Sequence, residues 1–244
     1  MSRKQWNVLL ILGLGLFFSV QTAMAESVSV EKQRDYYIQA KKALKKGHMR
    51  TYAQLIKKLD DYPLKPYLEY RYLRKRISSL PDSDIESFLE TYDRAPVGER
   101  MRFVWLRHLA AKGRWDKFLE QYRDGGNDRT RCLKAKALFK VSRFEEAMNE
   151  ADQLWLTSKS QPKICDQVFK SWKERGGMTD EMVWGRIKMA MEKGRTSLAT
   201  FLAKSLSKDD QRWVARWIAM RRKPAQNLHR RMYRTDNPIA QEIA

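Results

Sequence analysis

Residues 109–121, LAAKGRWDKFLEQ, carry the clearest structural signal in this chain. Small and apolar residues precede Gly113, a basic residue follows it, and a second amphipathic segment then begins. Glycine suits the left-handed residue at which an α-helix ends. The stretch therefore predicts two helices joined by a tight turn at Gly113.

The same pattern occurs at three other places, which makes it an internal repeat. Each copy has a turn residue, then a basic residue, then a second segment with a small or aromatic residue at one equivalent position. The copies are residues 43–55 (ALKKGHMRTYAQL), 138–150 (LFKVSRFEEAMNE) and 190–202 (AMEKGRTSLATFL), with turns at Gly47, Ser142 and Gly194. A helical hairpin cannot bury its apolar face alone, so repeated hairpins stack.

The rest of the chain also has helical periodicity. Residues 101–111, 144–155 and 186–192 carry apolar side chains at three- and four-residue spacing, and strict alternation over six or more residues is hard to find. Ser83 or Asp84, and Thr179 or Asp180, are the expected helix N-caps. We therefore predict an all-α fold, an irregular α-solenoid or superhelix of stacked antiparallel helical hairpins.

Residues 1–25 have the features of a cleaved signal peptide. Two cations precede an apolar run over residues 8–20, and Ala23 and Ala25 form the small-x-small pattern before a cleavage site at Glu26. The alternative is an uncleaved anchor, but the run is short for a membrane span, which needs roughly 20 residues. We expect residues 26–244 to form one α-superhelical domain in the periplasm, with the membrane met only during export.

Composition narrows the function classes. The 244 residues are 43% hydrophobic and 11% aromatic, with 49 Lys and Arg against 29 Asp and Glu, a net charge of +20. Collagen, a polytopic membrane protein, a disulfide-dense toxin and a wholly disordered chain are excluded. Because an exported protein meets few nucleic acids, we expect no nucleic acid as partner. The anions available to it are lipid headgroups and the carboxylates of cell-wall peptides, and the alternative is that the charge belongs to a solvated surface.

Cys132 and Cys165 are the two cysteines of the chain. An even count in an oxidising compartment suggests a disulfide, with two separate buried thiols as the alternative. No metal site is expected, because no C-x-x-C or H-x-x-x-H occurs and the three histidines are far apart. No nucleotide-binding or nucleophile motif is present either, so we expect no cofactor.

Two stretches resemble a known family. Residues 61–71, DYPLKPYLEYR, and 154–169, LWLTSKSQPKICDQVF, together with the signal peptide, resemble the N-terminal region of the exported soluble lytic murein transglycosylases. The resemblance covers residues 31–228. It implies a superhelical ring of helical hairpins, a Cys132–Cys165 pair, and peptidoglycan glycan strands as the partner.

The resemblance also implies an activity that these residues do not carry. The family cleaves the β-1,4 bond between N-acetylmuramic acid and N-acetylglucosamine, leaving a 1,6-anhydromuramoyl end, through a separate lysozyme-like domain. Its Glu-Ser segment with Gly-Leu-Met-Gln is not found here, where Glu26-Ser27 and Glu86-Ser87 lead into other sequence. We interpret Glu86 as a solvated carboxylate of an ordinary helix and expect no catalytic residue in this chain.

The sequence after residue 221 breaks off without a capping helix, so we expect a truncated gene, a fragment or a split product whose catalytic domain is missing or separately encoded. Two function hypotheses stand. The first is the non-catalytic part of a lytic transglycosylase that binds or positions peptidoglycan. The alternative is a stand-alone exported helical-repeat module that binds proteins or anionic wall polymer. An open frame for a lysozyme-like domain downstream of Ala244 would favour the first.

Overall fold

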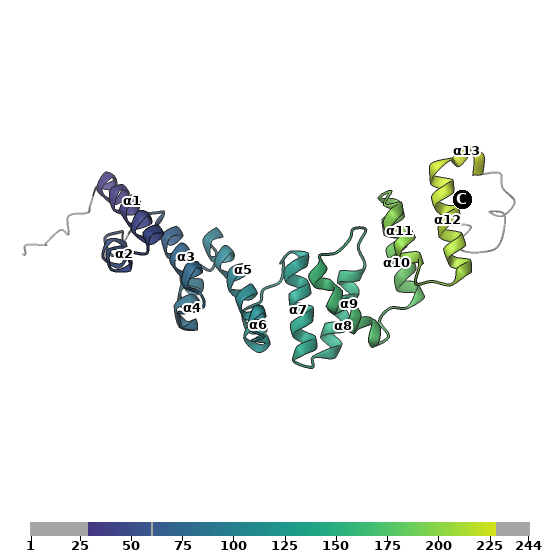
Figure 1. The fold of residues 1–244 in the computed structure, drawn as a ribbon, viewed down its shortest axis with the longest axis horizontal. Coiled ribbons are helices and arrows are strands. Elements are labelled where there is room, and N and C mark those ends of the chain that lie inside the picture. The colour runs from purple at the N-terminus through teal and green to yellow at the C-terminus, as the bar shows by residue number, and fades with distance from the viewer. Residues whose placement is uncertain (1–28, 60, 228–244) are drawn as a thin grey trace, which may run out of the picture. The chain divides into compact units, whose positions relative to one another are not determined.

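A computed structural model describes residues 29–59 and 61–227 of the chain. These residues form thirteen α-helices and one 3-10 helix, and no strand occurs among them (Figure 1). The expected all-α fold is confirmed. The predicted signal peptide and its cleavage site at Ala23, Ala25 and Glu26 lie outside the described residues, as does the end of the chain from residue 228.

The chain divides into two compact units, residues 1–65 and 66–244. The first contains the hairpin α1 (Val30–Lys46) and α2 (Met49–Ile56). Helix α3 (Lys65–Arg76) opens the second. The helices that follow are α4 (Asp82–Thr91), α5 (Pro96–Ala111), α6 (Trp115–Gln121), α7 (Asp128–Lys140), α8 (Phe144–Trp155), η1 (Lys163–Cys165), α9 (Asp166–Glu174), α10 (Asp180–Glu192), α11 (Thr196–Ala203), α12 (Lys208–Arg222) and α13 (Pro224–Asn227).

The four repeated turns share one backbone conformation. Gly47, Gly113 and Gly194 have φ of 82°, 69° and 70°, and Ser142 has φ of 62°. Ser142 is the single non-glycine residue with positive φ in the described part of the chain. Left-handed backbone is costly for a residue with a Cβ, which explains why glycine occupies the other three turns.

The hydrogen bonds of these turns are also equivalent. In each, the amide after the left-handed residue donates back to a carbonyl five residues earlier, as in the Schellman motif. The four bonds are His48 N to Ala43 O (2.9 Å), Arg114 N to Leu109 O (2.9 Å), Arg143 N to Leu138 O (2.9 Å) and Arg195 N to Ala190 O (2.8 Å). The repeat seen in the sequence is therefore a repeat of one turn geometry.

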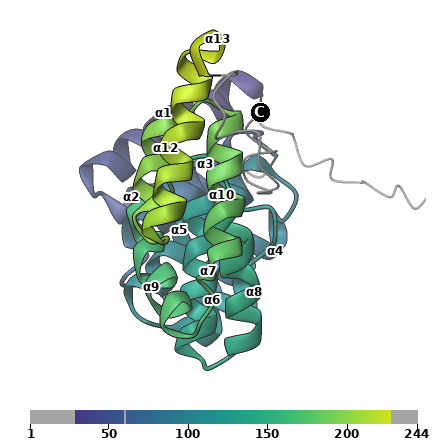
Figure 2. The ribbon, with the colours of Figure 1, turned by 90° about the vertical axis from the view of Figure 1, so that its right-hand side faces the viewer.

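The second helix of each hairpin begins directly after that basic residue and buries the residue at the equivalent position. Tyr52, Phe118, Ala147 and Ala199 are all buried. The residues at the last two positions are small, and α7 with α8 (Figure 2) and α10 with α11 (Figure 1) are closely packed pairs, as is α1 with α2.

The hairpins of the second unit pack against their neighbours in chain order, so this unit is an α-solenoid. One core cluster lies along α3 to α7 and includes Trp105 and Phe118. Another extends from α7 to α12 and includes Trp155 and Trp172. Ile164 packs against both clusters, which makes the core continuous.

The N-cap predictions had different outcomes. Thr179 caps α10, since its hydroxyl accepts a hydrogen bond from the Met182 amide at 3.3 Å, and this prediction is confirmed. The prediction of Ser83 or Asp84 was wrong, because α4 begins at Asp82 with Pro81 at the N-cap. The Asp82 carboxylate is instead bound by Arg114 of the neighbouring hairpin.

Cys132 of α7 and Cys165 of η1 are joined by a disulfide, with their Cα atoms 5.1 Å apart. Both residues are buried in the α7–α12 core. The bridge links the first helix of one hairpin to the segment that begins the next layer.

No helix within the described residues is long and apolar enough to cross a bilayer.

Replacing the strained turn residue should stabilise the protein. Ser142→Gly removes the cost of left-handed backbone, which stabilises the folded state. The glycine also increases the entropy of the unfolded chain, which offsets part of this gain. The free energy of unfolding should therefore rise by about 0.5–1 kcal/mol. Gly113→Ala should lower it by about 1–2 kcal/mol. Denaturant unfolding measures both changes. Ser160→Gly, in an exposed loop where φ is negative, is the control, and an equal rise there would contradict the explanation.

Breaking the disulfide should destabilise the second unit. Cys132→Ser should lower the free energy of unfolding by about 2–5 kcal/mol under oxidising conditions. A reductant should produce the same loss in the parent and no further loss in the variant. Thiol titration of the native protein supplies a second readout, and two free thiols there would rule the bridge out.

Candidate functional site

A hollow with a volume of about 880 Å³ lies between α3 and α5 in the second unit. We call it the α3–α5 hollow. Its principal side chains are Tyr70, Arg74, Arg100, Phe103, Arg107 and His108. They share one surface because residues three, four and seven apart lie on one face of a helix.

The α3–α5 hollow carries positive charge that the protein does not neutralise. Within the described residues, no carboxylate lies within ion-pair distance of the Arg74, Arg100 or Arg107 guanidinium. Glu99 also borders the hollow, but its carboxylate lies 4.0 Å from Nε of Arg102. Arg107 lies over the Phe103 ring, 5.8 Å from its centroid. The surface thus combines cations with aromatic faces.

His108 borders the hollow and stacks on a buried tryptophan. The His108 and Trp105 rings are nearly parallel, at 8°, with centroids 5.6 Å apart. Burial lowers the pKa of His108, and the nearby cations Lys112 and Arg114 lower it further, against the opposing effect of Asp82. A neutral imidazole both donates and accepts hydrogen bonds, as a sugar hydroxyl does.

The charges of a second hollow, between α4 and α6, neutralise one another. This hollow measures about 450 Å³. Lys117 lies 2.5 Å from Glu86, while Asp93 accepts Arg102 at 3.0 Å and Arg123 at 2.5 Å. Such pairs leave little charge for a ligand.

Glu86 occupies α4 beside the buried residues Ile85, Phe88 and Leu89, as expected. Its side chain is 26% exposed, and its carboxylate pairs with Lys117. Hydrogen bonding to Glu86 raises the pKa of Lys117. The carboxylate expected to be solvated is therefore only partly exposed and is held in an ion pair. Lys117 lies in the next hairpin, so sequence periodicity alone could not reveal this pair.

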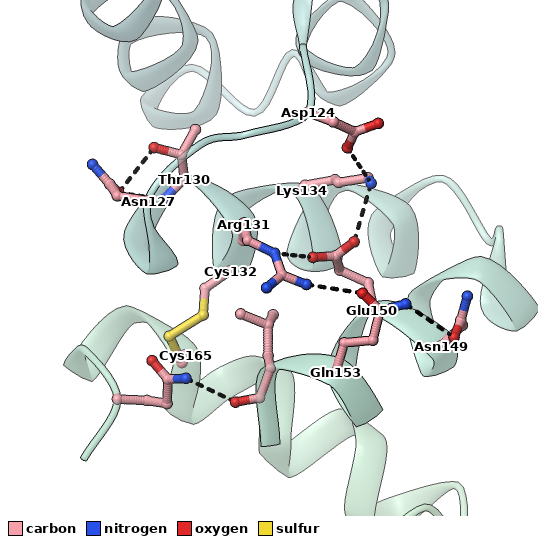
Figure 3. Close-up of polar contacts among 12 residues, drawn as sticks. Asp124, Asn127, Thr130, Arg131, Cys132, Lys134, Asn149, Glu150, Gln153 and Cys165 are labelled. Carbon is pink, nitrogen blue, oxygen red and sulfur yellow. Dashed lines mark hydrogen bonds and ion pairs between the residues drawn. A yellow bond between two sulfur atoms is a disulfide. The ribbon is translucent and has the colours of Figure 1, made fainter. Parts of the chain in front are cut away.

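Glu150 is the one buried acidic residue in the described part of the chain. Its carboxylate forms ion pairs with Arg131 Nε at 2.8 Å and with Lys134 Nζ at 3.0 Å (Figure 3). Lys134 also forms an ion pair with Asp124. Burial opposes the charged form of Lys134, but the hydrogen bonds to Asp124 and Glu150 outweigh it and raise the lysine pKa. These contacts tie α8 to α7.

The distinctive segment 154–169 is held by side chains that the sequence did not single out. Arg186 of α10 is 5% exposed, donates to the Lys159 carbonyl at 3.1 Å, and lies 4.4 Å over the Trp155 ring. Burial lowers its pKa to about 10. Gln161 donates to the Leu154 carbonyl at 2.7 Å. This segment therefore braces the fold around the disulfide.

Tryptophans contribute mostly to the core, as predicted. Trp105, Trp155 and Trp172 are buried, and the other tryptophans in the described residues are half-buried. A search of these residues finds no group of three or more His, Cys, Asp or Glu that could hold a metal ion.

Relatives of the chain come from one group of bacterial enzymes. The soluble lytic murein transglycosylase of Escherichia coli K12 is 30% identical over 215 residues, which are 88% of this chain and 33% of that protein. Its Salmonella typhimurium counterpart is 30% identical over 202 residues, 82% of this chain and 31% of that protein. This chain is homologous to one part of the soluble lytic murein transglycosylases. It spans about a third of their length.

Solved structures agree with these relatives. The 70 kDa soluble lytic transglycosylase of Escherichia coli matches with a TM-score of 0.72 and 30% identity, over 89% of this chain and 35% of that one. The lytic transglycosylase Slt of Pseudomonas aeruginosa matches with a TM-score of 0.75 and 32% identity, over 85% of this chain and 34% of that one. The resemblance inferred from residues 61–71 and 154–169 is confirmed.

A family model described as Cucumovirus coat protein also matches, over residues 133–237. The described part of that range is made of helices and loops, whereas jelly-roll capsid domains are β-sandwiches. This match therefore carries no functional argument.

The lowered pKa of His108 makes stability depend on pH. Between its folded pKa and about 6.5, the unfolded chain binds more protons at this residue, so the free energy of unfolding should fall as pH drops below about 6.5. In His108→Gln and His108→Asn this fall should be smaller. Denaturant unfolding at pH 7.5, 6 and 5 makes the comparison, and parallel curves for parent and variants would contradict it.

Proposed function

We propose that the chain, after removal of residues 1–25, is a non-catalytic periplasmic module that binds and positions peptidoglycan glycan strands. The homology to about a third of the soluble lytic murein transglycosylases carries this proposal. Proteins with that name act on murein, and the shared part is the helical-hairpin region that this chain contains.

The carboxylates of the described residues support a role without cleavage. A glycosidic acid is a carboxylic acid kept protonated by a partly apolar cleft. Glu150 is buried but lies between two cations, and Glu86 is paired with Lys117. Both carboxylates are therefore engaged by cations of the fold.

Charge supports binding to the wall. The full chain carries +20, and the free carboxylates of wall peptides are the opposite charges it would meet. Attraction between exposed charges is screened over about 8–10 Å at physiological salt. Contacts with aromatic rings and sugar hydroxyls are much less sensitive to salt, so the two contributions can be separated.

A sacculus assay tests the proposal. The exported chain is isolated, its mass is measured to establish whether it begins at Glu26, and it is incubated with purified sacculi. We expect it to pellet with the sacculi, to release more protein as salt rises, and to leave no anhydro-muropeptides by chromatography.

One variant tests for a missed acid. Anhydro products that disappear in Glu86→Gln would assign catalysis to Glu86, and products that persist there would place the acid elsewhere. Either result would contradict a non-catalytic role. Absence of pelleting at low salt would contradict binding. Glu192→Gln, which removes an exposed carboxylate on α10, serves as the control for the lost charge.

A further inference from the structure

The α3–α5 hollow differs from its neighbours in what its cations contact. In the α4–α6 hollow the cations form ion pairs: Lys117 with Glu86, and Arg102 and Arg123 with Asp93. In the α3–α5 hollow, three guanidinium groups border a volume of about 880 Å³ without a carboxylate partner among the described residues. Unpaired arginines gathered around a concave surface are complementary to an anionic ligand.

The spacing of these arginines follows from the helix. Arg100 and Arg107 are seven residues apart on α5, two turns along one face, with Phe103 between them at i+3. Arg74 comes from α3, and Tyr70 lies one turn before it on the same face. Guanidinium groups and aromatic rings from two helices thus line the same hollow.

A hollow of this composition suits one kind of ligand. Guanidinium forks pair with carboxylates through two parallel hydrogen bonds. Aromatic faces pack on the apolar faces of sugar rings, and His108 offers a donor and an acceptor to hydroxyl groups. Volumes of about 300–1,000 Å³ accommodate small-molecule ligands, so the hollow has room for a disaccharide with part of a peptide.

We propose that the α3–α5 hollow is a binding site for a carboxylate-bearing sugar–peptide unit, in which Arg74, Arg100 and Arg107 pair with peptide carboxylates and Tyr70 and Phe103 contact the sugar. This site rests on the proposed function, because it takes a peptidoglycan unit as its ligand. Glu99 limits the site on one side, where its carboxylate repels that of the ligand and is directed to Arg102.

A third hollow supplies the matched control. It lies between α7 and α9, measures about 330 Å³, and also contains three cations, Lys136, Lys140 and Lys170. Lys136 lies 5.5 Å over the Trp115 ring, and Lys170 is 3.9 Å from Glu174. Removing these lysines changes net charge as much as removing the three arginines, but leaves the α3–α5 hollow intact.

Calorimetric titration of the full exported chain tests the site. The probe is the soluble disaccharide tetrapeptide released from sacculi, compared with the same compound after its carboxylates are converted to amides. We expect the amidated probe to bind at least about tenfold more weakly, since charge-assisted hydrogen bonds are lost. Equal affinities for the two probes would overturn the proposal.

Two triple variants locate the contact. Arg74→Gln, Arg100→Gln and Arg107→Gln together should weaken binding of the unmodified probe at least about tenfold, whereas Lys136→Gln, Lys140→Gln and Lys170→Gln together should change it less than about twofold. Equal losses in the two would mean diffuse attraction, and no loss in the arginine variant would place the ligand elsewhere. Both results overturn the site.

Further measurements separate the causes of failure. Replacing the three arginines by lysine keeps the charge but removes the forked geometry, and should still weaken binding several-fold. Unchanged melting curves establish that each variant is folded. If the parent does not pellet with sacculi, the proposed function fails; if it pellets and the arginine variant binds the probe like the parent, only the site fails.

Discussion

The left-handed turn between paired helices is the constraint on which the rest of the structure depends. The chain reverses direction at Gly47, Gly113, Ser142 and Gly194, where φ lies between 62° and 82°. The same backbone hydrogen bond crosses each of these turns. Because the next helix starts immediately, its first buried residue is placed against the preceding helix. Each hairpin is thereby fixed locally, but its apolar face still needs a neighbour, and stacking in the second unit supplies that neighbour.

Ion pairs within and between hairpins then divide the charged residues into two groups. The first group forms ion pairs within the protein: Glu150 with Arg131 and Lys134, Glu86 with Lys117, and Asp82 with Arg114. The other group, the arginines of the α3–α5 hollow, remains available to a ligand. Net charge does not distinguish these groups, because it counts paired and unpaired cations alike. The proposed site therefore depends on which cations lack a carboxylate partner, and not on the total number of cations.

Local features were predictable from the sequence, and contacts between hairpins were not. The turns at Gly113 and Gly194, the Thr179 cap and the all-α fold follow from residue type and spacing over a few positions. Arg186, which braces segment 154–169, and Lys117, which neutralises Glu86, act on residues 27 and 31 positions away. The start of α4 was misplaced because the helix begins at Asp82, directly after Pro81 at the N-cap. No periodicity encodes such pairs, and the α3–α5 hollow was missed because it requires two helices to be placed together.

The central claim is that this chain holds a peptidoglycan unit at the α3–α5 hollow without cleaving it. Side-chain Nε–Hε signals of arginine in a ¹⁵N spectrum report that contact directly, when soluble glycan strands with free peptide carboxylates are added. We expect the signals of Arg74, Arg100 and Arg107 to shift together and saturably, that of the buried Arg186 to stay in place, and the strands to remain intact. Shifts confined to other arginines, or none at saturating ligand, would contradict the account.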